Sequence, residues 1–310
     1  MNRLTALLCG ALLLPAAPRA QVPAPSVPVG LRPKVRPVAA APARREQLRV
    51  YLLLGQSNMA GRGVVEAADT TAPARVWRLN PAGQWEQAKD PLHFDKPVAG
   101  VGPGLSFGRA MAAAEPEAVI GLVPCAVGGT AISTWQPGAL DAATNTHPYD
   151  DALRRARVAL QSGTLAGILW NQGEADSSPE KSQAYAQHLA ALIGRLRQDL
   201  GAPAVPFVAA QLPAFQYERP DSLGPRRASA GAVQLNATVA GLAQTVPHYA
   251  YITTEGTRHR GDQLHYDAAS ARLLGRRYAA AMLRLQAEAT SPPAPKPKSR
   301  APAKPTKSRT

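Results

Sequence analysis

One serine stands where a buried strand is predicted to end. Ser57 lies in the heptapeptide GQSNMAG, residues 55–61, directly after the apolar run 50–54. Glycine allows the sharp turn that must follow such a strand, and open α/β sheets keep their active sites at the carboxyl ends of their strands. Backbone N–H groups around this position can bind an oxyanion. The pattern favours Ser57 as a nucleophile, whereas a serine between glycines alone is also typical of an ordinary turn.

A serine nucleophile needs a neighbouring base, and the last part of the chain offers one. His265 can take the serine proton and later return it to the leaving group. Asp262 stands three residues earlier, a spacing that suits a short turn folding back on itself and that holds the imidazole in the useful tautomer. His259 is the one rival base near this motif, but no carboxylate stands three residues before it. The residues therefore predict a triad of Ser57, His265 and Asp262.

A tetrahedral intermediate needs hydrogen-bond donors for its oxyanion. Gly128 follows a predicted strand and can bring its backbone N–H close because it has no side chain. Gln172 follows another strand and can add a side-chain N–H, as Ser57 can add its backbone N–H. The alternatives are that Gly128 only forms a turn and that Gln172 only bridges loops. Asn171 directly precedes Gln172, so either amide can be the one that points into the site.

Apolar runs alternate with helical patterns through the middle of the chain, which predicts a parallel sheet covered on both faces. The predicted strands are 48–54, 119–123, 166–170, 205–211 and 249–253. The predicted helices are 181–200, a second that begins with Asp267 as N-cap, and a third capped by Asp150 or Asp151. The turn-rich stretch 63–104 is expected to help wall a cleft.

Four short segments, in this order, resemble the four sequence blocks of SGNH hydrolases. They are GQSNMAG at 55–61, GGT at 128–130, QGE at 172–174 and Asp-x-x-His at 262–265. More narrowly, they resemble the sialate O-acetylesterase-like branch that includes the family 6 carbohydrate esterases, such as acetylxylan esterases. This resemblance implies a flavodoxin-like three-layer α/β/α sandwich with a central parallel sheet of about five strands. It also implies a serine esterase that removes O-acetyl groups from sugars through an acetyl-enzyme.

The resemblance assigns the same residues to the same roles. It implies Ser57 as nucleophile, His265 as base and Asp262 as the orienting acid, with Ser57, Gly128 and Gln172 forming the oxyanion hole. Many members of the superfamily have Asn where this chain has Gln172, whereas Gln is usual in the narrower branch.

Three further residues of these blocks are expected to support the site without reacting: Gln56, Asn58 and Glu174. No cofactor and no metal are expected, because the other histidines lack metal-ligand spacing. Trp77, Trp85 and Trp135 are expected to pack in the core, with stacking on sugar rings as the alternative.

Two other functions compete with this prediction. A lipase or thioesterase can use the same fold, but the sequence offers no long apolar segment to cover its site. A noncatalytic carbohydrate-binding protein has no need for the serine, histidine and aspartate together. We therefore expect a carbohydrate esterase.

The net charge of +14 invites a nucleic-acid function, but the charge lies at the two ends of the chain. Residues 21–49 carry +5 and residues 290–310 carry +6, whereas 50–289 hold 21 basic and 20 acidic residues. A nearly neutral body argues against a binding face for DNA or RNA.

The ends of the chain are predicted to lie outside the esterase domain, 47–289. Arg3 followed by the apolar stretch 4–14 is typical of an export signal cleaved after Ala20, which places the protein in the periplasm or outside the cell. Its removal takes away Cys9, so the mature chain keeps only Cys125, expected to be a buried apolar residue.

The proline-rich segment 21–46 and the Lys- and Pro-rich segment 290–310 are expected to be disordered, because neither can bury enough apolar surface. The basic tail is expected to be a solvated spacer, with weak attachment to an anionic envelope or polysaccharide as the alternative. We expect a monomer.

Overall fold

The apolar run before Ser57 forms β1 (Leu48–Gly55), a strand in the middle of the main sheet. The computed structural model describes residues 36–38, 40, 44–221 and 224–290. Alternate side chains of β1 enter two different cores: Leu53 packs on one face of the sheet and Leu52 on the other. A parallel strand buried on both faces must be apolar at nearly every position, which explains why its sequence does not alternate.

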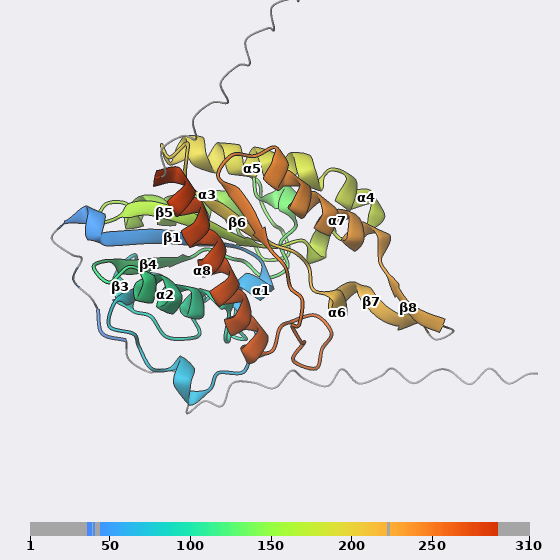
Figure 1. The fold of residues 1–310 in the computed structure, drawn as a ribbon, viewed down its shortest axis with the longest axis horizontal. Helices are drawn as coiled ribbons and strands as arrows, with labels where there is room; N and C mark the ends of the chain where they lie inside the picture. The colour runs from blue at the N-terminus through green and yellow to red at the C-terminus, as the bar shows by residue number, and fades with distance from the viewer. Residues whose placement is uncertain (1–35, 39, 41–43, 222–223, 291–310) are drawn as a thin grey trace, which may run out of the picture.

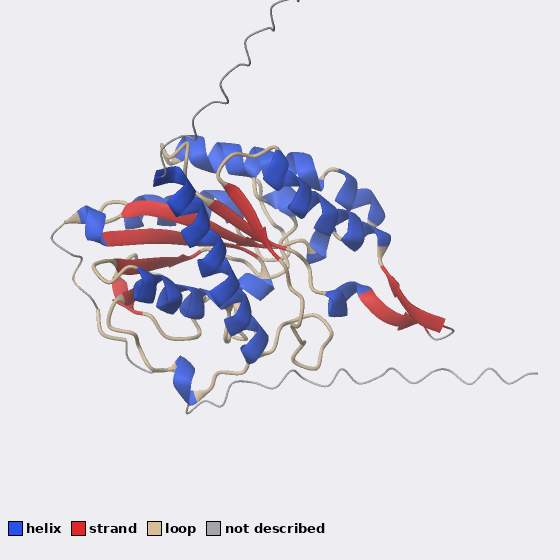
Figure 2. Ribbon diagram, viewed as in Figure 1, coloured by secondary structure: helices blue, strands red, loops and turns tan. Residues whose placement is uncertain are grey.

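Seven strands form the main sheet, in the order β3-β2-β4-β1-β5-β6-β9 (Figures 1 and 2). All neighbours are parallel except β3 and β2, which are antiparallel. The strands besides β1 are β2 (Val76–Leu79), β3 (Trp85–Gln87), β4 (Val119–Pro124), β5 (Thr164–Asn171), β6 (Phe207–Ala210) and β9 (Tyr249–Ile252).

The five predicted strands are all present and lie side by side as β4-β1-β5-β6-β9. In chain order of those five this is 2-1-3-4-5, the flavodoxin-like arrangement. The predicted number of strands was too low, and the sheet is mixed. The two additional strands, β2 and β3, come from the turn-rich stretch 63–104 and have four and three residues, too few for a clear periodic pattern.

Helices cover both faces of this sheet. In one core, side chains of α2 and α8 pack against it, and in the other those of α3, α5 and α7 do so. The helices are α1 (Ser57–Ala60), α2 (Pro103–Ala114), α3 (Pro148–Ala159), α4 (Pro179–Gln183), α5 (Tyr185–Asp199), α6 (Ala214–Tyr217), α7 (Ala230–Gly241) and α8 (Ala268–Thr290).

The predicted helix starts have mixed outcomes. Asp267 does cap α8, because its side chain accepts a hydrogen bond from the backbone N–H of Ser270 at 2.7 Å. The cap of α3 was predicted wrongly: the helix begins at Pro148, a residue favoured at the first helical position. Its two aspartates therefore lie inside the first turn, where they interact favourably with the helix dipole.

The predicted helix 181–200 is divided into α4 and α5 at Ala184. Its predicted apolar face is nevertheless buried, including Tyr185, Leu189 and Leu192. A short antiparallel pair, β7 (Glu218–Asp221) and β8 (Gly224–Ala228), projects beside α6 (Figure 1).

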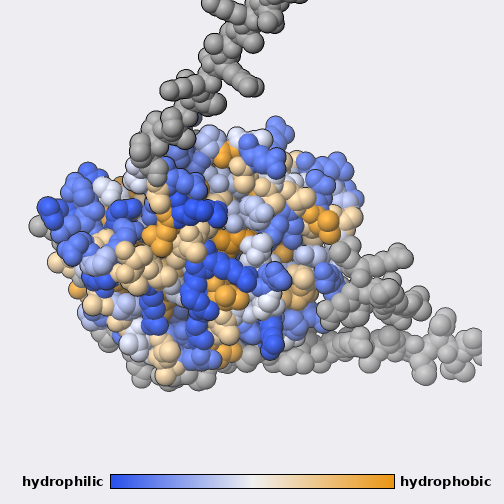
Figure 3. All heavy atoms as spheres, viewed as in Figure 1, coloured by the Kyte–Doolittle hydropathy of each residue, from blue (hydrophilic) through white to orange (hydrophobic). Residues whose placement is uncertain are grey.

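The surface in the view of Figure 3 mixes hydrophilic residues with small apolar patches. None of the helices in the described ranges is both long and apolar enough to cross a membrane. The predicted signal 1–20, most of the linker 21–46 and the tail from residue 291 lie outside the described residues. Within the linker, Arg36 differs from the expected disorder, because its side chain is held on the domain by the carbonyl oxygens of Lys89 and Pro91.

The close approach of α8 to α2 generates a stability prediction. A β-carbon on Gly275 would lie 2.8 Å from the backbone nitrogen of Phe107, and closer still to the carbonyl oxygen of Pro103. Gly275→Ala should therefore lower the free energy of unfolding by about 1–3 kcal/mol, although alanine is the better helix former. Gly194→Ala in α5 is the matched control, because no atom lies within 4 Å of its added β-carbon. It should raise stability by up to ~1 kcal/mol. Urea unfolding of both variants measures this, and equal effects would contradict the tight packing.

Candidate active site

Ser57 begins α1 directly beyond the end of β1. The turn depends on Gly55, which has φ +123° and lies so close to the backbone of Asn171 that a β-carbon would overlap its carbonyl group. Only glycine fits there, because the positive φ and the contact both exclude a side chain. Ser57 is 8% exposed. The strand end therefore holds its side chain at the carboxyl edge of the sheet, as predicted.

The structure brings His265 and Asp262 to Ser57. The distance from His265 Nε2 to Ser57 Oγ is 3.1 Å, and from His265 Nδ1 to Asp262 Oδ2 it is 2.8 Å. With a carboxylate beside it, Nδ1 carries the proton and donates it to Asp262, which leaves the lone pair of Nε2 for the serine hydroxyl. The arrangement can therefore remove a proton from Ser57.

A tight turn fixes this pair. The other oxygen of Asp262, Oδ1, accepts hydrogen bonds from the backbone N–H of Leu264 at 3.0 Å and of His265 at 2.8 Å. Partial burial raises the pKa of Asp262, but the hydrogen bonds from His265 and Leu264 outweigh it and hold the pKa below its ordinary value. The carboxylate therefore stays charged into the acidic range.

The rival base, His259, has a different position in the same loop. Its Nδ1 accepts the backbone N–H groups of Gly261 at 3.0 Å and Gln263 at 3.2 Å. These bonds occupy a ring nitrogen in shaping the turn that leads to His265. His259 therefore supports the loop, and no bond joins it to the serine.

A second network anchors the residue just before the histidine. Asn58 Nδ2 donates to the carbonyl oxygen of Leu264 at 3.1 Å and to Glu174 Oε1 at 2.5 Å. Asn58 Oδ1 accepts the backbone N–H of Tyr266 at 3.2 Å. Gln216 donates to the same two acceptors, the Leu264 carbonyl at 2.6 Å and Glu174 Oε1 at 3.2 Å. Asn58 thus bonds to the residues on both sides of His265, and Glu174 bonds to Asn58.

The sequence prediction missed Gln216. It lies in the four-residue helix α6, far along the chain from the other blocks, and no local spacing relates it to them.

Gly128 lies beside Ser57, but its N–H is already used. A β-carbon on Gly128 would lie 3.5 Å from Ser57 Cβ. Its backbone nitrogen donates to Asp95 Oδ2 at 3.0 Å, and Arg62 Nη2 donates to the same oxygen at 2.8 Å. The side chains of this ion pair are only 3% and 2% exposed. The sequence prediction missed both residues. For Gly128 to hold an oxyanion, its bond to Asp95 must be exchanged.

Gln172 is fully buried and its amide is also used within the fold. Its Nε2 donates to the Thr130 carbonyl at 3.1 Å and to Asp176 Oδ2 at 2.5 Å, and its Oε1 accepts from Tyr185 at 3.0 Å. These bonds join Gln172 to Thr130, Asp176 and Tyr185. Gln172 therefore bridges loops, which is the alternative role that the sequence left open. Its oxyanion role stays a prediction that requires one of them to break.

Two neighbouring amides have atoms without a partner. Asn171 Nδ2 and Gln56 Oε1 are buried and have no hydrogen-bond partner in the described part of the chain. Both residues are almost completely buried, and Gln56 N donates to the Asn171 carbonyl at 2.9 Å. Of the adjacent side-chain amides of Asn171 and Gln172, that of Asn171 therefore has the unused donor.

The remaining predicted residues lie in the interior. Trp85 and Trp135 are buried in the core, and Cys125 is buried, which raises the pKa of its thiol to about 11. Trp77 is partly buried against the same core. No group of three or more His, Cys, Asp or Glu side chains in the described ranges is arranged to hold a metal ion.

Comparison with known proteins agrees with this geometry. A family model described as "carbohydrate esterase, sialic acid-specific acetylesterase" matches residues 47–284. The chain belongs to this family. A relative from Arabidopsis thaliana, named as the probable carbohydrate esterase At4g34215, is 35% identical over an alignment of 184 residues, and the match covers 52% of this chain and 67% of the relative.

Solved structures agree with the fold of this carbohydrate esterase. The crystal structure of the Arabidopsis protein has a TM-score of 0.65 and 28% identity, and the match covers 77% of this chain and 98% of that one. NanS has a TM-score of 0.59 at 18% identity, covering 79% and 99%. XAC1771, a carbohydrate acetylesterase from Xanthomonas citri, has a TM-score of 0.56 at 20% identity, and the match covers 77% of this chain and 56% of that one. The last two identities are low, so they show the fold alone.

The shared acceptors of Asn58 and Gln216 generate a prediction for this esterase. Asn58→Ala should lower kcat/KM on a soluble ester by roughly 10- to 100-fold, because a small displacement of the catalytic loop is costly. Gln216→Ala should cost less, since Asn58 still holds both acceptors. The double variant should lose more than the product of the two single effects. Gln136→Ala is the control, an exposed glutamine whose side chain donates to the carbonyl oxygen of nearby Ser133. Strictly additive losses would mean that the two residues do not share a function.

Proposed function

We propose that this esterase removes O-acetyl groups from carbohydrates through an acetyl-enzyme formed on Ser57. One observation carries the proposal: the chain of hydrogen bonds from Ser57 Oγ to His265 Nε2 at 3.1 Å and from His265 Nδ1 to Asp262 at 2.8 Å. Membership of a carbohydrate esterase family supports the substrate class. Acetylated xylan and O-acetylated sialic acid are the two substrates to test first.

In the first half-reaction Ser57 Oγ bonds to the acetyl carbonyl carbon while its proton moves to His265 Nε2. The negative charge of Asp262 stabilises the imidazolium that forms. When the tetrahedral intermediate collapses, the bond to the sugar oxygen breaks. That oxygen takes the proton from Nε2, so the sugar leaves as an alcohol and the acetyl group stays on Ser57.

In the second half-reaction water replaces the sugar. His265 takes a proton from the water as its oxygen attacks the acetyl carbon, and then returns a proton to Ser57 Oγ. Acetic acid leaves and loses its proton to the solvent, and the enzyme is restored. No other reagent is needed, so the atoms and charges balance with ester and water alone.

The oxyanion must be held in both half-reactions. Ser57 is the first residue of α1, so its backbone N–H has no acceptor within the helix and is available. Gly128 can be the second donor once substrate displaces Asp95, whose carboxylate occupies its N–H. Gln172 can contribute only if it gives up Thr130 or Asp176.

Variants of the triad test the mechanism. Ser57→Ala and His265→Ala should each lower kcat by about 10⁴–10⁶, because the residues act as a unit. Asp262→Asn should be less damaging than His265→Ala; in a well-studied triad the equivalent change costs about 10⁴. Steady-state kinetics on p-nitrophenyl acetate measures all three. Activity that survives in His265→Ala but is lost in His259→Ala would show that His259, and not His265, is the base.

The substrate class is tested by acetate release from acetylated xylan and O-acetylated N-acetylneuraminic acid, with a long-chain p-nitrophenyl ester for comparison. Hydrolysis of either acetylated carbohydrate in preference to the long-chain ester supports the proposal. Preference for the long acyl chain would favour a lipase. Saccharide binding without turnover would favour a noncatalytic protein.

We also propose that the enzyme is exported. The pattern of Arg3, the apolar stretch 4–14 and the small residues before Gln21 supports this. The amino-terminal sequence of protein recovered from the periplasm or medium should begin at Gln21. A protein that keeps Met1 and stays in the cytoplasm would contradict export.

A further inference from the structure

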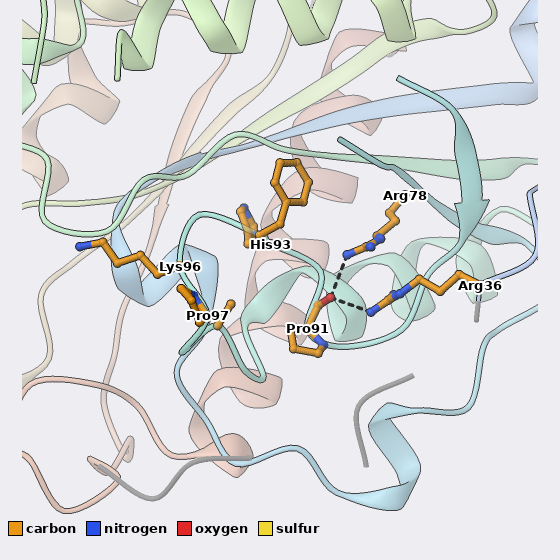
Figure 4. A pocket seen from close by; sticks show the side chains of 8 residues that line it. Arg36, Arg78, Pro91, His93, Lys96 and Pro97 are labelled. Atoms are coloured by element: carbon orange, nitrogen blue, oxygen red, sulfur yellow. Dashed lines mark hydrogen bonds between the residues drawn. The ribbon is translucent and has the colours of Figure 1, made fainter. Parts of the chain in front are cut away.

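A cavity of about 380 Å³ lies along the segment between β3 and α2 (Figure 4). A volume of this size is typical of sites for small molecules. The residues that line it are Arg36, Arg78, Pro91, His93, Phe94, Lys96, Pro97 and Ala99. Asp95, in the middle of this segment, reaches the backbone of Gly128 beside Ser57. Phe94 and Lys96 of the cavity lining therefore flank the residue that bonds to the loop beside the proposed nucleophile.

One wall of the cavity is held rigid by arginines. Arg36 and Arg78 both donate to the carbonyl oxygen of Pro91 at 2.9 Å (Figure 4). Arg78 also donates to Leu92 and to Glu86 Oε1. Because these donors are occupied, the two guanidinium groups act as supports for the segment rather than as free ligands for an anion.

Phe94 is exposed in this cavity although it is a large aromatic residue. It is 41% exposed, and it is the one aromatic among the exposed large hydrophobic residues of the described ranges. The guanidinium of Arg155 lies 4.7 Å from the centre of its ring, a stabilising cation–π contact. A ring covered on one face and open on another presents a flat apolar surface.

Arg155 is itself fixed, so the ring has a firm support. Arg155 donates to the carbonyl oxygens of Pro124 at 2.9 Å and Leu79 at 2.8 Å. These residues end β4 and β2. Phe94 therefore lies above the carboxyl ends of these two strands, and β4 is the direct neighbour of β1, the strand that leads to Ser57.

A polar group without a partner also lines the cavity. His93 is 4% exposed, and its Nε2 has no hydrogen-bond partner in the described structure. Burial lowers the pKa of His93 to about 4, so the ring is neutral at pH 7. The backbone of Leu53 offers the neutral ring a hydrogen-bond partner, and Nε2 is the nitrogen left without one, so it can act as an acceptor. Hydroxyl groups are the donors that such an acceptor needs.

We propose that Phe94 is the platform on which a sugar ring of the substrate stacks, with His93 Nε2 accepting a hydrogen bond from one of its hydroxyl groups. Apolar C–H faces of a pyranose match an exposed aromatic ring, and its hydroxyls match the unpaired acceptor. This inference rests on the proposed carbohydrate esterase function. The Phe94 platform would make the enzyme prefer an acetylated sugar to a simple acetyl ester.

Kinetics with two kinds of substrate test the platform. The ratio of kcat/KM on acetylated xylo-oligosaccharide, or on O-acetylated N-acetylneuraminic acid, to that on p-nitrophenyl acetate is the readout. Phe94→Ala should lower this ratio roughly 3- to 10-fold, mainly through KM, because an aromatic contact of this kind contributes modestly. Phe94→Tyr should keep the ratio, since it keeps the ring. Val98→Ala, at an even more exposed apolar residue of the same segment, should change neither activity.

Binding measurements separate this inference from the proposed function. Calorimetry in a Ser57→Ala background records binding of the same saccharides without turnover. Weaker binding after adding Phe94→Ala supports the platform, even if the parent enzyme hydrolyses neither saccharide and the proposed function fails. Saccharide binding that is absent, or equal with and without Phe94, overturns the inference. So does a Phe94→Tyr variant that behaves like Phe94→Ala.

Discussion

The hydrogen bond between His265 and Ser57 joins side chains 208 residues apart in the sequence. Most of the fold helps to set the distance between these two side chains. Ser57 is placed by the end of β1, a strand with neighbours on both sides. His265 is placed by a loop that continues into α8, which packs against α2. Because proton transfer needs hydrogen-bond distance, an error of about 1 Å in either element would weaken the site.

Three carboxylates of the site make different contacts. Asp262 accepts hydrogen bonds from the His265 side chain and from two backbone N–H groups. Glu174 accepts hydrogen bonds from Asn58 and Gln216 and thereby helps to hold the loop that carries His265. Asp95 is paired with Arg62 in a nearly water-free position. Breaking a buried ion pair leaves an uncompensated charge at high cost, so the pair keeps Arg62 and the Gly128 loop in fixed positions.

The two edges of the site are built differently. On the histidine side, polar networks fix a short loop whose own residues supply most of the hydrogen bonds. On the other side, the segment between β3 and α2 is held by arginine side chains that donate to its carbonyl oxygens. The first arrangement controls the catalytic proton. The second supports a surface where the aromatic ring of Phe94 can stay exposed.

The sequence by itself determined the five central strands, the amphipathic helices and the positions of Ser57, Asp262 and His265. Those features depend on local patterns: apolar runs, helical spacing and a three-residue turn. Only the tertiary structure decided which donors are free. In the structure the backbone N–H of Gly128 donates to Asp95, and the side-chain amide of Gln172 donates to Thr130 and Asp176. The tertiary structure also brought Gln216 to the catalytic loop and Arg155 to Phe94. A polar group takes the partner that the fold places within about 3 Å, and residues dozens of positions apart carry no shared periodicity from which that partner can be read.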